Sequence, residues 1–430
     1  MQSRVIETCG KLIPHYQHGF ISQRGTGTQI LRTTKFITYE LESRPNSGSV
    51  AMISTDLSKA FDSINHDRLT HKLLEADIPC NTVKLFEGYP ADRHITGRFR
   101  TTIGTSMRVP HGVPQGSILG PLIFNLYVHD IPTQRGRDYM MSQYADDLCI
   151  LNETTQSPSF AIRRAQWAAT DLIRYYRYNG LQVNVSKTEC MLFTRRRNHA
   201  TTMDITEEYE DGTCTSTPIP IQPSIKCLGV HLDKRMSMNV HTNYILKRAR
   251  QTRGMLAPII GYYSNTDIAT KLLVIQACLL PVLDYGVVQI LPRCSKTNIL
   301  KLERQYRMAL KSAGQFPRRI ATSMLWELLD EDPWHLRISD LHRDLLERLP
   351  TMGIQDLTEL GRPYLRHGQH NPTLPSRRLV NIDHLTTIES RTKRAAGQLL
   401  PGHTGYIRIS LLLSIQTLLE NKNTRMLYLA

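Results

Sequence analysis

The segment Tyr144-Ala145-Asp146-Asp147 places two adjacent carboxylates between two apolar runs, Met140-Met141 and Leu148-Cys149-Ile150-Leu151. Neighbouring side chains of a strand point to opposite faces, so both acids can converge on one ion only where the backbone turns sharply, as at the tip of a hairpin. A surface Asp-Asp turn is the ordinary alternative, and turn composition alone favours it by about three to one. An acid elsewhere in the chain has to decide between the two interpretations.

Asp56 is that acid. Residues 49–54 are short, apolar and rich in β-formers, which predicts a buried strand that ends at Asp56. At the exit of a core strand the scaffold fixes a carboxylate while an ion can still reach it. A helix N-cap is an equally good interpretation of Asp56 taken alone.

Between these acids lies a loop rich in Gly and Pro, Gly112-Val113-Pro114-Gln115-Gly116-Ser117, followed by an apolar helix. A backbone without bulky side chains can approach a ligand closely, and a helix N-terminus favours an anion. A plain helix cap is the alternative, although the order Pro-Gln-Gly-Ser is more specific than capping requires. Near the N-terminus, Arg24-Gly25-Thr26-Gly27 suits a second loop that contacts phosphate.

The remaining periodicity predicts helices at 28–41 and 67–76, a shorter helix capped by Asn81, a basic hairpin at 95–109 and a helix that begins at Ser157-Pro158. The acidic segment Asp204 to Asp211 is expected to be a solvated excursion.

Helices follow at about 241–256, 267–280 and 297–313. The last of these helices places Arg304, Arg307 and Lys311 on one face, which suits either a surface that follows a phosphate backbone or a merely solvated cationic face.

Composition points to a polyanionic partner. The chain has 430 residues, 40% of them hydrophobic, with a net charge of +15 and a pI near 9.5. Nucleic acid is the simplest partner for such a charge, and a membrane surface is the alternative. The longest apolar stretches are broken by Pro121 and Pro281, so no membrane span is expected.

The N-terminus lacks a signal peptide, and the eight cysteines form no Cys-x-x-Cys pair. We therefore expect an intracellular, non-secreted protein without a zinc site or a disulfide framework.

Three carboxylates in one place repel one another unless divalent cations bind. Two Mg²⁺ ions about 4 Å apart would clamp the attacking and leaving oxygens of a phosphoryl transfer. Hard oxygen ligands favour Mg²⁺ over zinc, and Mn²⁺ is the expected substitute.

Five motifs in order resemble those of a reverse transcriptase, in the phrasing of the LINE-type (non-LTR) retrotransposon enzymes. They are Ser54 to Asp62, Gly112 to Ser117, Tyr144 to Asp147, Gly180 to Thr188, and Leu228-Gly229-Val230. The resemblance covers about residues 17–233, and the basic helices to about 315 are similar to the family's thumb.

The resemblance implies an α+β right-hand polymerase. Residues 1–49 would form partial fingers, and 50–232 the palm with an antiparallel sheet and a fingers insertion around 76–111. Residues 233–320 would form a helical thumb, and 321–430 a mostly helical C-terminal region of unknown role. Because the family's fingers normally begin earlier, we expect an N-terminally truncated chain that keeps the active-site carboxylates and lacks part of the grip on the triphosphate.

The resemblance also implies a role for individual residues. Asp56 and Asp146 would ligate both Mg²⁺ ions, with Asp147 a weaker ligand, and Lys187 would protonate the leaving pyrophosphate. The nucleotide would be contacted by the Leu57 carbonyl, by Phe61 as the gate against a ribose 2′-hydroxyl, and by Gln115 and Gly116. The primer and template would lie near Arg24, Tyr144, Cys227, Leu228 and Gly229.

The implied activity is RNA-directed DNA synthesis from an RNA template, a DNA primer and dNTPs, with action in the nucleus. An inactive nucleic-acid-binding remnant of a retrotransposon is the alternative. A viral-type RNA polymerase is a weaker one, because Phe61 and the order Ala145-Asp146-Asp147 argue against it.

Overall fold

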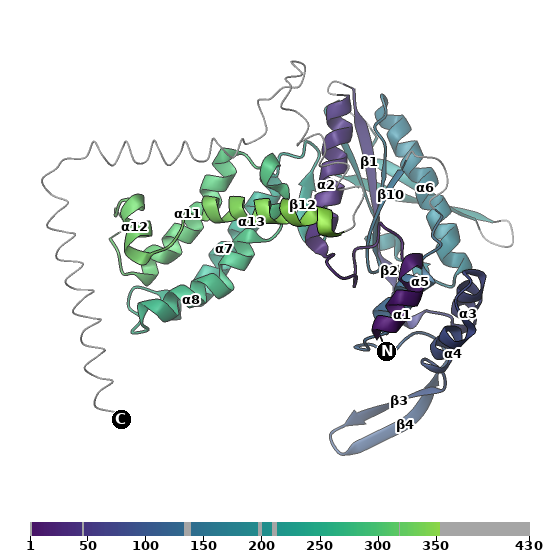
Figure 1. Ribbon diagram of the computed structural model, residues 1–430. Helices are drawn as coiled ribbons and strands as arrows, with labels where there is room; N and C mark the ends of the chain where they lie inside the picture. Colours follow the sequence, from purple (N-terminus) through teal and green to yellow (C-terminus); the bar gives the residue numbers. More distant parts are fainter. Residues whose placement is uncertain are drawn as a thin grey trace, which may run out of the picture.

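The computed structural model describes residues 2–44, 47–132, 139–196, 200–208, 213–317 and 319–352. A six-stranded sheet organises it (Figure 1). In spatial order the strands are β5 (Tyr139–Tyr144), β6 (Asp147–Asn152), β1 (Ser49–Thr55), β8 (Glu189–Thr194), β10 (Cys214–Gln222) and β9 (Thr202–Glu208). Neighbouring strands run antiparallel, as expected, except for the parallel pair β8 and β10.

Alternate residues of the central strand β1 enter two different cores, as the two-residue period of a strand requires. Val50 and Met52 pack in the core that contains α2 (Thr26–Ser43). Ala51 and Ile53 pack in the core beneath α6 (Pro158–Tyr178). The sheet is therefore covered by helices on both faces, with α2 on one side and α6 on the other (Figure 1).

A third core joins the N-terminal helix α1 (Gln2–Cys9) to α3 (His66–Glu75), α4 (Cys80–Gly88) and α5 (Gly120–Tyr127). From this part projects the predicted basic hairpin, β3 (Arg93–Phe99) and β4 (Thr102–Val109), which is confirmed (Figure 1). Asn81 was the wrong cap for the short helix, because α4 already includes Cys80 and its N-cap position is Pro79.

The helices that follow the sheet in sequence extend away from it as an arm (Figure 1). They are α7 (Asn239–Ile260), α8 (Ile268–Cys278), α9 (Leu280–Asp284), α10 (Val287–Ile290), α11 (Lys296–Ala313), α12 (Thr322–Leu329) and α13 (Trp334–Arg348). Leu325, Trp334 and Ile338 of the last two helices share one core with the earlier ones. The boundary at residue 320 stays a prediction, and most of the predicted C-terminal region lies outside the described residues.

The expected solvated excursion at Asp204 to Asp211 is wrong where the structure describes it. Strand β9 pairs with β10 and extends the sheet, with Met203 and Ile205 buried against the α6 core beside Ile219. Apolar residues alternate with polar ones there, and the acidic residues that dominate the composition obscured this strand pattern. Residues 209–211 lie outside the described ranges.

The predicted α+β class is confirmed by this sheet and its covering helices. Among the described residues, no single helix is long and apolar enough to cross a membrane. A bent pair, Ile268–Asp284 with Val287–Arg293, passes on length and composition alone. Residues of this pair, such as Ile275, Leu283 and Ile290, belong to the protein core.

Candidate active site

The two adjacent carboxylates lie at the tip of a hairpin, as their sequence context predicted. Strands β5 and β6 stay in register up to the pair Tyr144 and Asp147, which leaves Ala145 and Asp146 as the loop. Ala145 adopts a left-handed conformation, with φ 56°. This sharp reversal leaves Asp146 half-buried and Asp147 exposed.

Asp56 comes to the same edge of the sheet because β1 pairs with β6. Thr55, the last residue of β1, lies opposite Leu148, so Asp56 follows directly beside the Asp146-Asp147 turn. The carbonyl oxygen of Asp56 accepts a hydrogen bond of 2.8 Å from the Asn184 amide. The neighbouring helical turn η3 (Val185–Lys187) carries Lys187, whose Nζ lies 2.9 Å from Asp56 Oδ2.

The electrostatics of this edge show carboxylates that repel one another. Burial raises the pKa of Asp146, and the nearby charge of Asp56 raises it further. Burial, Asp146 and Asp56 raise the pKa of Asp147. The hydrogen bond to Asp56 raises the pKa of Lys187, which is therefore the cation that partly compensates the group.

Carboxylate oxygens are the donors that Mg²⁺ prefers, so the residue types fit a divalent cation. Within the described ranges, no group of three or more His, Cys, Asp or Glu side chains is arranged to hold a metal ion. The ion pair with Lys187 occupies one oxygen of Asp56 instead. The donor chemistry thus fits a cation, although the side chains do not form a ligand cage as they stand.

The predicted nucleotide residues lie on two connected segments. The 3₁₀ turn η2 (Ala60–Asp62) contains Phe61, whose carbonyl oxygen accepts a 2.9 Å bond from the Val113 amide. Gln115 Nε2 donates to Asp62 Oδ1 at 3.1 Å. The loop that precedes α5 is therefore tied to the turn that follows Asp56, which brings Gln115 and Gly116 beside Phe61.

Aromatic contacts fix the ring of Phe61. Its centroid lies 4.9 Å from that of Phe124 on α5 and 6.4 Å from that of Phe20, which meets it edge to face. Phe61 remains only partly buried. Leu57, by contrast, is buried in the short strand β2 (Leu57–Ser58), which pairs with β7 (Gln182–Val183).

A second tight hairpin carries Leu228 and Gly229. Strands β11 (Ser224–Cys227) and β12 (Val230–Asp233) leave these two residues as the loop, with φ 44° and 82°. Two successive positive φ values are typical of a two-residue hairpin turn. Cys227 Sγ lies 3.9 Å from Cys149 Sγ on β6, the strand that begins at Asp147. This hairpin therefore adjoins the strand ends that carry Asp56, Asp146 and Asp147, which we call the carboxylate edge.

Tyr285, between α9 and α10, holds this turn through a 2.6 Å hydrogen bond from its hydroxyl to the Leu228 carbonyl oxygen. Tyr285→Phe should cost about 1 kcal/mol of stability. If the turn holds the primer, the KM for primed template should rise severalfold with kcat unchanged. Steady-state extension assays measure this, with the exposed Tyr263→Phe as control. An unchanged KM would contradict the link between this contact and the primer.

Arg24 has a structural role that its sequence context did not reveal. Its Nη1 donates to the carbonyl oxygens of His15 and Gln17, both at 2.9 Å, and so holds the segment that precedes it. Sequence reasoning also missed Gln17, Gly19 and Asn125, which contact one another or the Asp146 turn. The signals for this region were the nearby loop of Gly and Thr residues and the start of the family resemblance at about residue 17.

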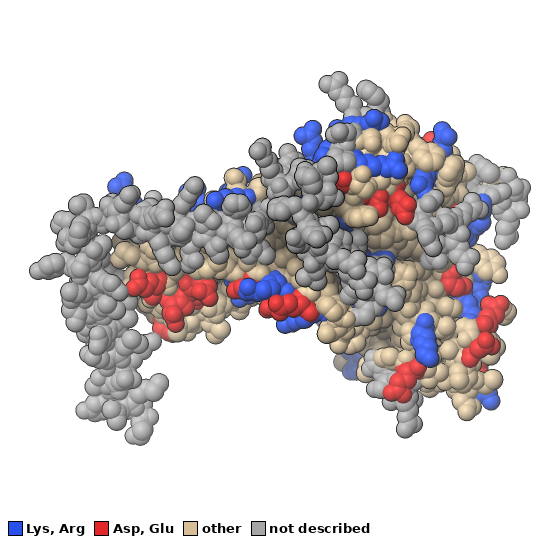
Figure 2. Space-filling view, turned by 45° about the horizontal axis from the view of Figure 1, so that its top comes forward, with Lys and Arg blue, Asp and Glu red and all other residues tan. Residues whose placement is uncertain are grey.

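The predicted basic face of α11 is partly engaged within the protein. Arg307 donates to Thr322 Oγ1 at 2.9 Å, and Lys311 donates to the Ile320 carbonyl oxygen at 3.3 Å. Arg304 remains exposed. On the face shown in Figure 2, basic and acidic side chains are interspersed, so the excess positive charge does not form one continuous patch there.

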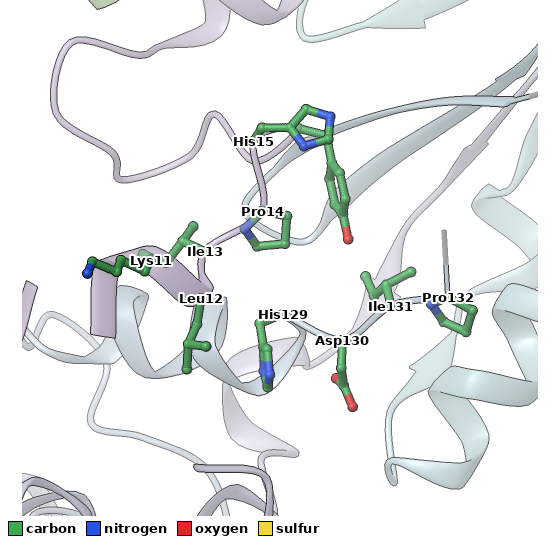
Figure 3. A pocket seen from close by; sticks show the side chains of 10 residues that line it. Lys11, Leu12, Ile13, Pro14, His15, His129, Asp130, Ile131 and Pro132 are labelled. Carbon is green, nitrogen blue, oxygen red and sulfur yellow. The ribbon is translucent and has the colours of Figure 1, made fainter. Parts of the chain in front are cut away.

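A separate cavity of about 760 Å³ lies between residues 11–16 and 129–132 (Figure 3). Asp130 at its edge accepts hydrogen bonds from Lys72 Nζ at 2.6 Å and from the Tyr175 hydroxyl at 2.5 Å. None of the predicted site residues lines this cavity. It is therefore distinct from the carboxylate edge.

Comparison with known families identifies the protein family of the chain that carries this carboxylate edge. Residues 1–232, more than half of the chain, match the family model described as reverse transcriptase (RNA-dependent DNA polymerase). The chain belongs to the reverse transcriptase family. The matched range contains all three carboxylates and the whole six-stranded sheet that carries them.

Relatives from mobile elements confirm the resemblance to LINE-type enzymes. The chain is 27% identical over 346 residues to the probable RNA-directed DNA polymerase from transposon BS of Drosophila melanogaster, covering 79% of this chain and 35% of the relative. It is 24% identical over 399 residues to the RNA-directed DNA polymerase from mobile element jockey of the same organism, covering 89% and 39%. The chain thus spans between a third and two fifths of these relatives.

Among solved structures, the chain resembles apo telomerase from Candida tropicalis with a TM-score of 0.37 and 12% identity, covering 95% of this chain and 59% of that one. It also resembles an RNA-dependent RNA polymerase mutant of a human picobirnavirus, with a TM-score of 0.29 and 13% identity, covering 76% and 53%.

Proposed function

We propose that this chain extends a DNA primer with dNTPs along an RNA template. The observation that carries the proposal is the convergence of Asp56, Asp146 and Asp147 at one sheet edge, in a chain of the reverse transcriptase family. In phosphoryl transfer the protein mainly positions the reacting groups and stabilises the negative charge that develops on them. Carboxylates that hold divalent cations supply that stabilisation.

Asp56 and Asp146 would hold the two Mg²⁺ ions, and Asp147 would be a weaker ligand. When bound, the ions polarise the phosphate and stabilise charge on the attacking and leaving oxygens, and Mn²⁺ could replace them. Asp56 is paired with Lys187, whose Nζ lies 2.9 Å from Asp56 Oδ2. We assign the Lys187 ammonium to protonation of the leaving pyrophosphate, because it lies beside a carboxylate that would hold the ions.

The nucleotide would lie over the segment from Leu57 to Phe61 and against the Gln115-Gly116 loop. A partly buried ring such as Phe61, held by Phe124, can exclude a ribose 2′-hydroxyl by its bulk. Gly116 leaves its backbone open to the ligand, because a Cβ built there would meet nothing within 4 Å. The Leu57 carbonyl would complete the contacts of the nucleotide-bound ion.

The primer and template would contact Tyr144, the turn from Cys227 to Gly229, and the region of Arg24. The β3–β4 hairpin supports a nucleic-acid partner, because residues 93–109 contain four arginines and no acid. Its Phe99 ring is exposed, as suits a single-stranded nucleic acid whose bases stack on aromatic side chains. Action on a genomic target would place the protein in the nucleus.

The test is primer extension by the purified chain on an oligonucleotide-primed RNA template with dNTPs and Mg²⁺. We expect dNTP- and template-dependent extension. RNA binding that weakens with salt, without extension at any Mg²⁺ or Mn²⁺ concentration, would instead identify a binding remnant. Because the chain spans less than two fifths of its relatives, the same assay on a longer chain would separate lost activity from a missing segment.

Phe61→Ala should admit ribonucleotides, because it removes the ring that faces the sugar. We expect the ratio of dNTP to rNTP kcat/KM to fall about tenfold or more, a difference of about 1.4 kcal/mol or more in discrimination. Phe61→Tyr, which keeps the ring, is the matched control and should retain the wild-type ratio. Unchanged discrimination in Phe61→Ala would remove this residue from the gate.

A further inference from the structure

The N-terminal segment around Gln17 lies directly against the hairpin that carries Asp146 and Asp147. The backbone amide of Gln143 donates to the Tyr16 backbone carbonyl oxygen at 2.9 Å, and the backbone amide of His18 donates to the Gln143 backbone carbonyl oxygen at 2.7 Å. These two bonds form a parallel bridge beside the edge strand β5. The segment therefore runs alongside the last residues before the turn.

The Gln17 side chain forms hydrogen bonds with the backbone of the turn itself. Its Oε1 accepts a 3.0 Å bond from the Ala145 amide and a 2.8 Å bond from the Gly19 amide. Its Nε2 donates to the Ala145 carbonyl oxygen at 3.3 Å, and Gln143 Nε2 donates to the same oxygen at 2.8 Å. Gln17 is 1% exposed, so these bonds form away from solvent, where an unpaired polar group is costly.

Gly19 makes this approach possible. A Cβ at Gly19 would lie 2.3 Å from the Ala145 amide nitrogen, closer than any side chain tolerates. From the other side, Asn125 Nδ2 on α5 donates to the Gly19 carbonyl oxygen at 3.1 Å. The segment is thus held between α5 and the turn.

Ala145 needs such support. With φ 56° it adopts a left-handed conformation, which costs a residue with a Cβ free energy that the surroundings have to offset. Gln17 bonds both the amide and the carbonyl of this one residue. Asp146 and Asp147 follow it directly, so a change in the Ala145 dihedral angles would redirect both carboxylates.

We propose that Gln17 is a positioning residue that fixes the Ala145 backbone and thereby aims Asp146 and Asp147 at a divalent cation. The inference rests on the proposed function for the identity of the ligand. Gln17 touches neither substrate nor cation in this role. It acts as an outer partner of the ligands, and such partners typically contribute about 10- to 100-fold to metal affinity or activity.

Gln29 provides a matched control. It is also a fully buried glutamine beside β5, and its Nε2 donates to the Ser142 carbonyl oxygen at 3.2 Å. That bond is to β5 itself and not to the Ala145-Asp146 loop. A general loss of a buried amide should therefore affect Gln17→Met and Gln29→Met alike, whereas loss of positioning should affect only the first.

The experiment measures Mn²⁺ binding to the full chain by electron paramagnetic resonance, in the absence of nucleotide, together with the melting temperature and primer extension. For Gln17→Met we expect Mn²⁺ affinity to fall about 10- to 100-fold and kcat to fall with it, at an unchanged KM for dNTP. Gln29→Met should melt at a similar temperature and keep wild-type Mn²⁺ affinity. Gln17→Asn, which keeps an uncharged amide but shortens its reach to Ala145, is the second variant if Gln17→Met does not fold, and it should lower Mn²⁺ affinity in the same direction.

Three outcomes overturn the inference. Wild-type Mn²⁺ affinity in the Gln17 variants, or an equal loss in Gln29→Met, would overturn it while leaving the proposed function intact. Mn²⁺ binding that is unaffected by Asp146→Asn in the wild-type background would overturn the proposed metal site and the inference with it. The Asp146→Asn arm therefore distinguishes the two failures.

Discussion

Asp146→Asn is expected to abolish primer extension while making the cation-free protein more stable to heat. The first effect follows because an amide cannot supply the negative oxygen that the proposed ions need, and we expect less than about one thousandth of wild-type activity. The second follows from electrostatics. Burial and the charge of Asp56 raise the pKa of Asp146, which means that its ionised form is less favourable in the folded than in the unfolded chain.

The sign of the stability effect can be worked out from that direction. At neutral pH the ionised Asp146 destabilises the cation-free fold, and the destabilisation fades as the pH falls through its raised pKa. The neutral Asn removes it, so the melting temperature at pH 7 should rise. Mg²⁺ should stabilise the wild type by binding the folded state, and it should stabilise Asp146→Asn much less.

Both effects are measured by primer extension and by thermal melting with and without Mg²⁺. Asp147→Asn is the informative comparison, because Asp147 is exposed and is proposed as the weaker ligand. We expect its activity loss to be only about 10- to 100-fold. Full extension by Asp146→Asn would contradict the assignment of the carboxylate edge as the active site.

The carboxylate edge could be predicted from the sequence because its signals are local. An apolar run ending in Asp56 and two adjacent acids between apolar runs each imply a strand end or a hairpin tip, and the pairing of β1 with β6 brings them together. The hydrogen bonds between Gln17 and the Ala145 backbone could not be predicted in this way. Its partner Ala145 is distant in sequence, and no periodic pattern marks which polar side chain will reach a given backbone amide.

Two other differences have similar physical causes. The acidic residues of β9 obscured its strand pattern, in which Met203 and Ile205 alternate with polar residues and are buried. Helical spacing placed Arg307 and Lys311 on one face, but it could not show that the segment leading into α12 would pack there and accept their hydrogen bonds. Sequence pattern thus located the elements, whereas contacts between distant elements determined the partners of individual polar side chains.

Gly112→Ala should disrupt the fold and the proposed nucleotide site together. Gly112 has φ 77°, and a Cβ there would lie 2.6 Å from the Asp62 Cα and 2.7 Å from the Asp62 carbonyl oxygen. Because these are backbone atoms of the turn that carries Phe61, they cannot move without moving Phe61. The combined strain and overpacking should cost about 2–4 kcal/mol of stability.

The hydrogen bonds around Gly112 explain why the effect should reach the nucleotide. Its amide donates to the Ile64 carbonyl oxygen at 2.7 Å, and its own carbonyl oxygen accepts from Arg93 Nη2 at 2.6 Å. Separation of this loop from the η2 turn would move Gln115 away from Phe61. In the fraction that remains folded, we therefore expect a higher KM for dNTP, measured below the melting transition.

Two glycines separate the causes of such a loss. Gly116 has φ 78° but no atom within 4 Å of a built Cβ, so Gly116→Ala reports backbone strain without a clash and should cost about 1 kcal/mol. Gly254, inside α7, has neither feature, and Gly254→Ala should stabilise the protein by up to about 1 kcal/mol. A melting temperature for Gly112→Ala equal to that of Gly116→Ala would show that the contact with Asp62 does not constrain the loop. The junction would then be too loose to hold the gate and the nucleotide loop in a fixed relation.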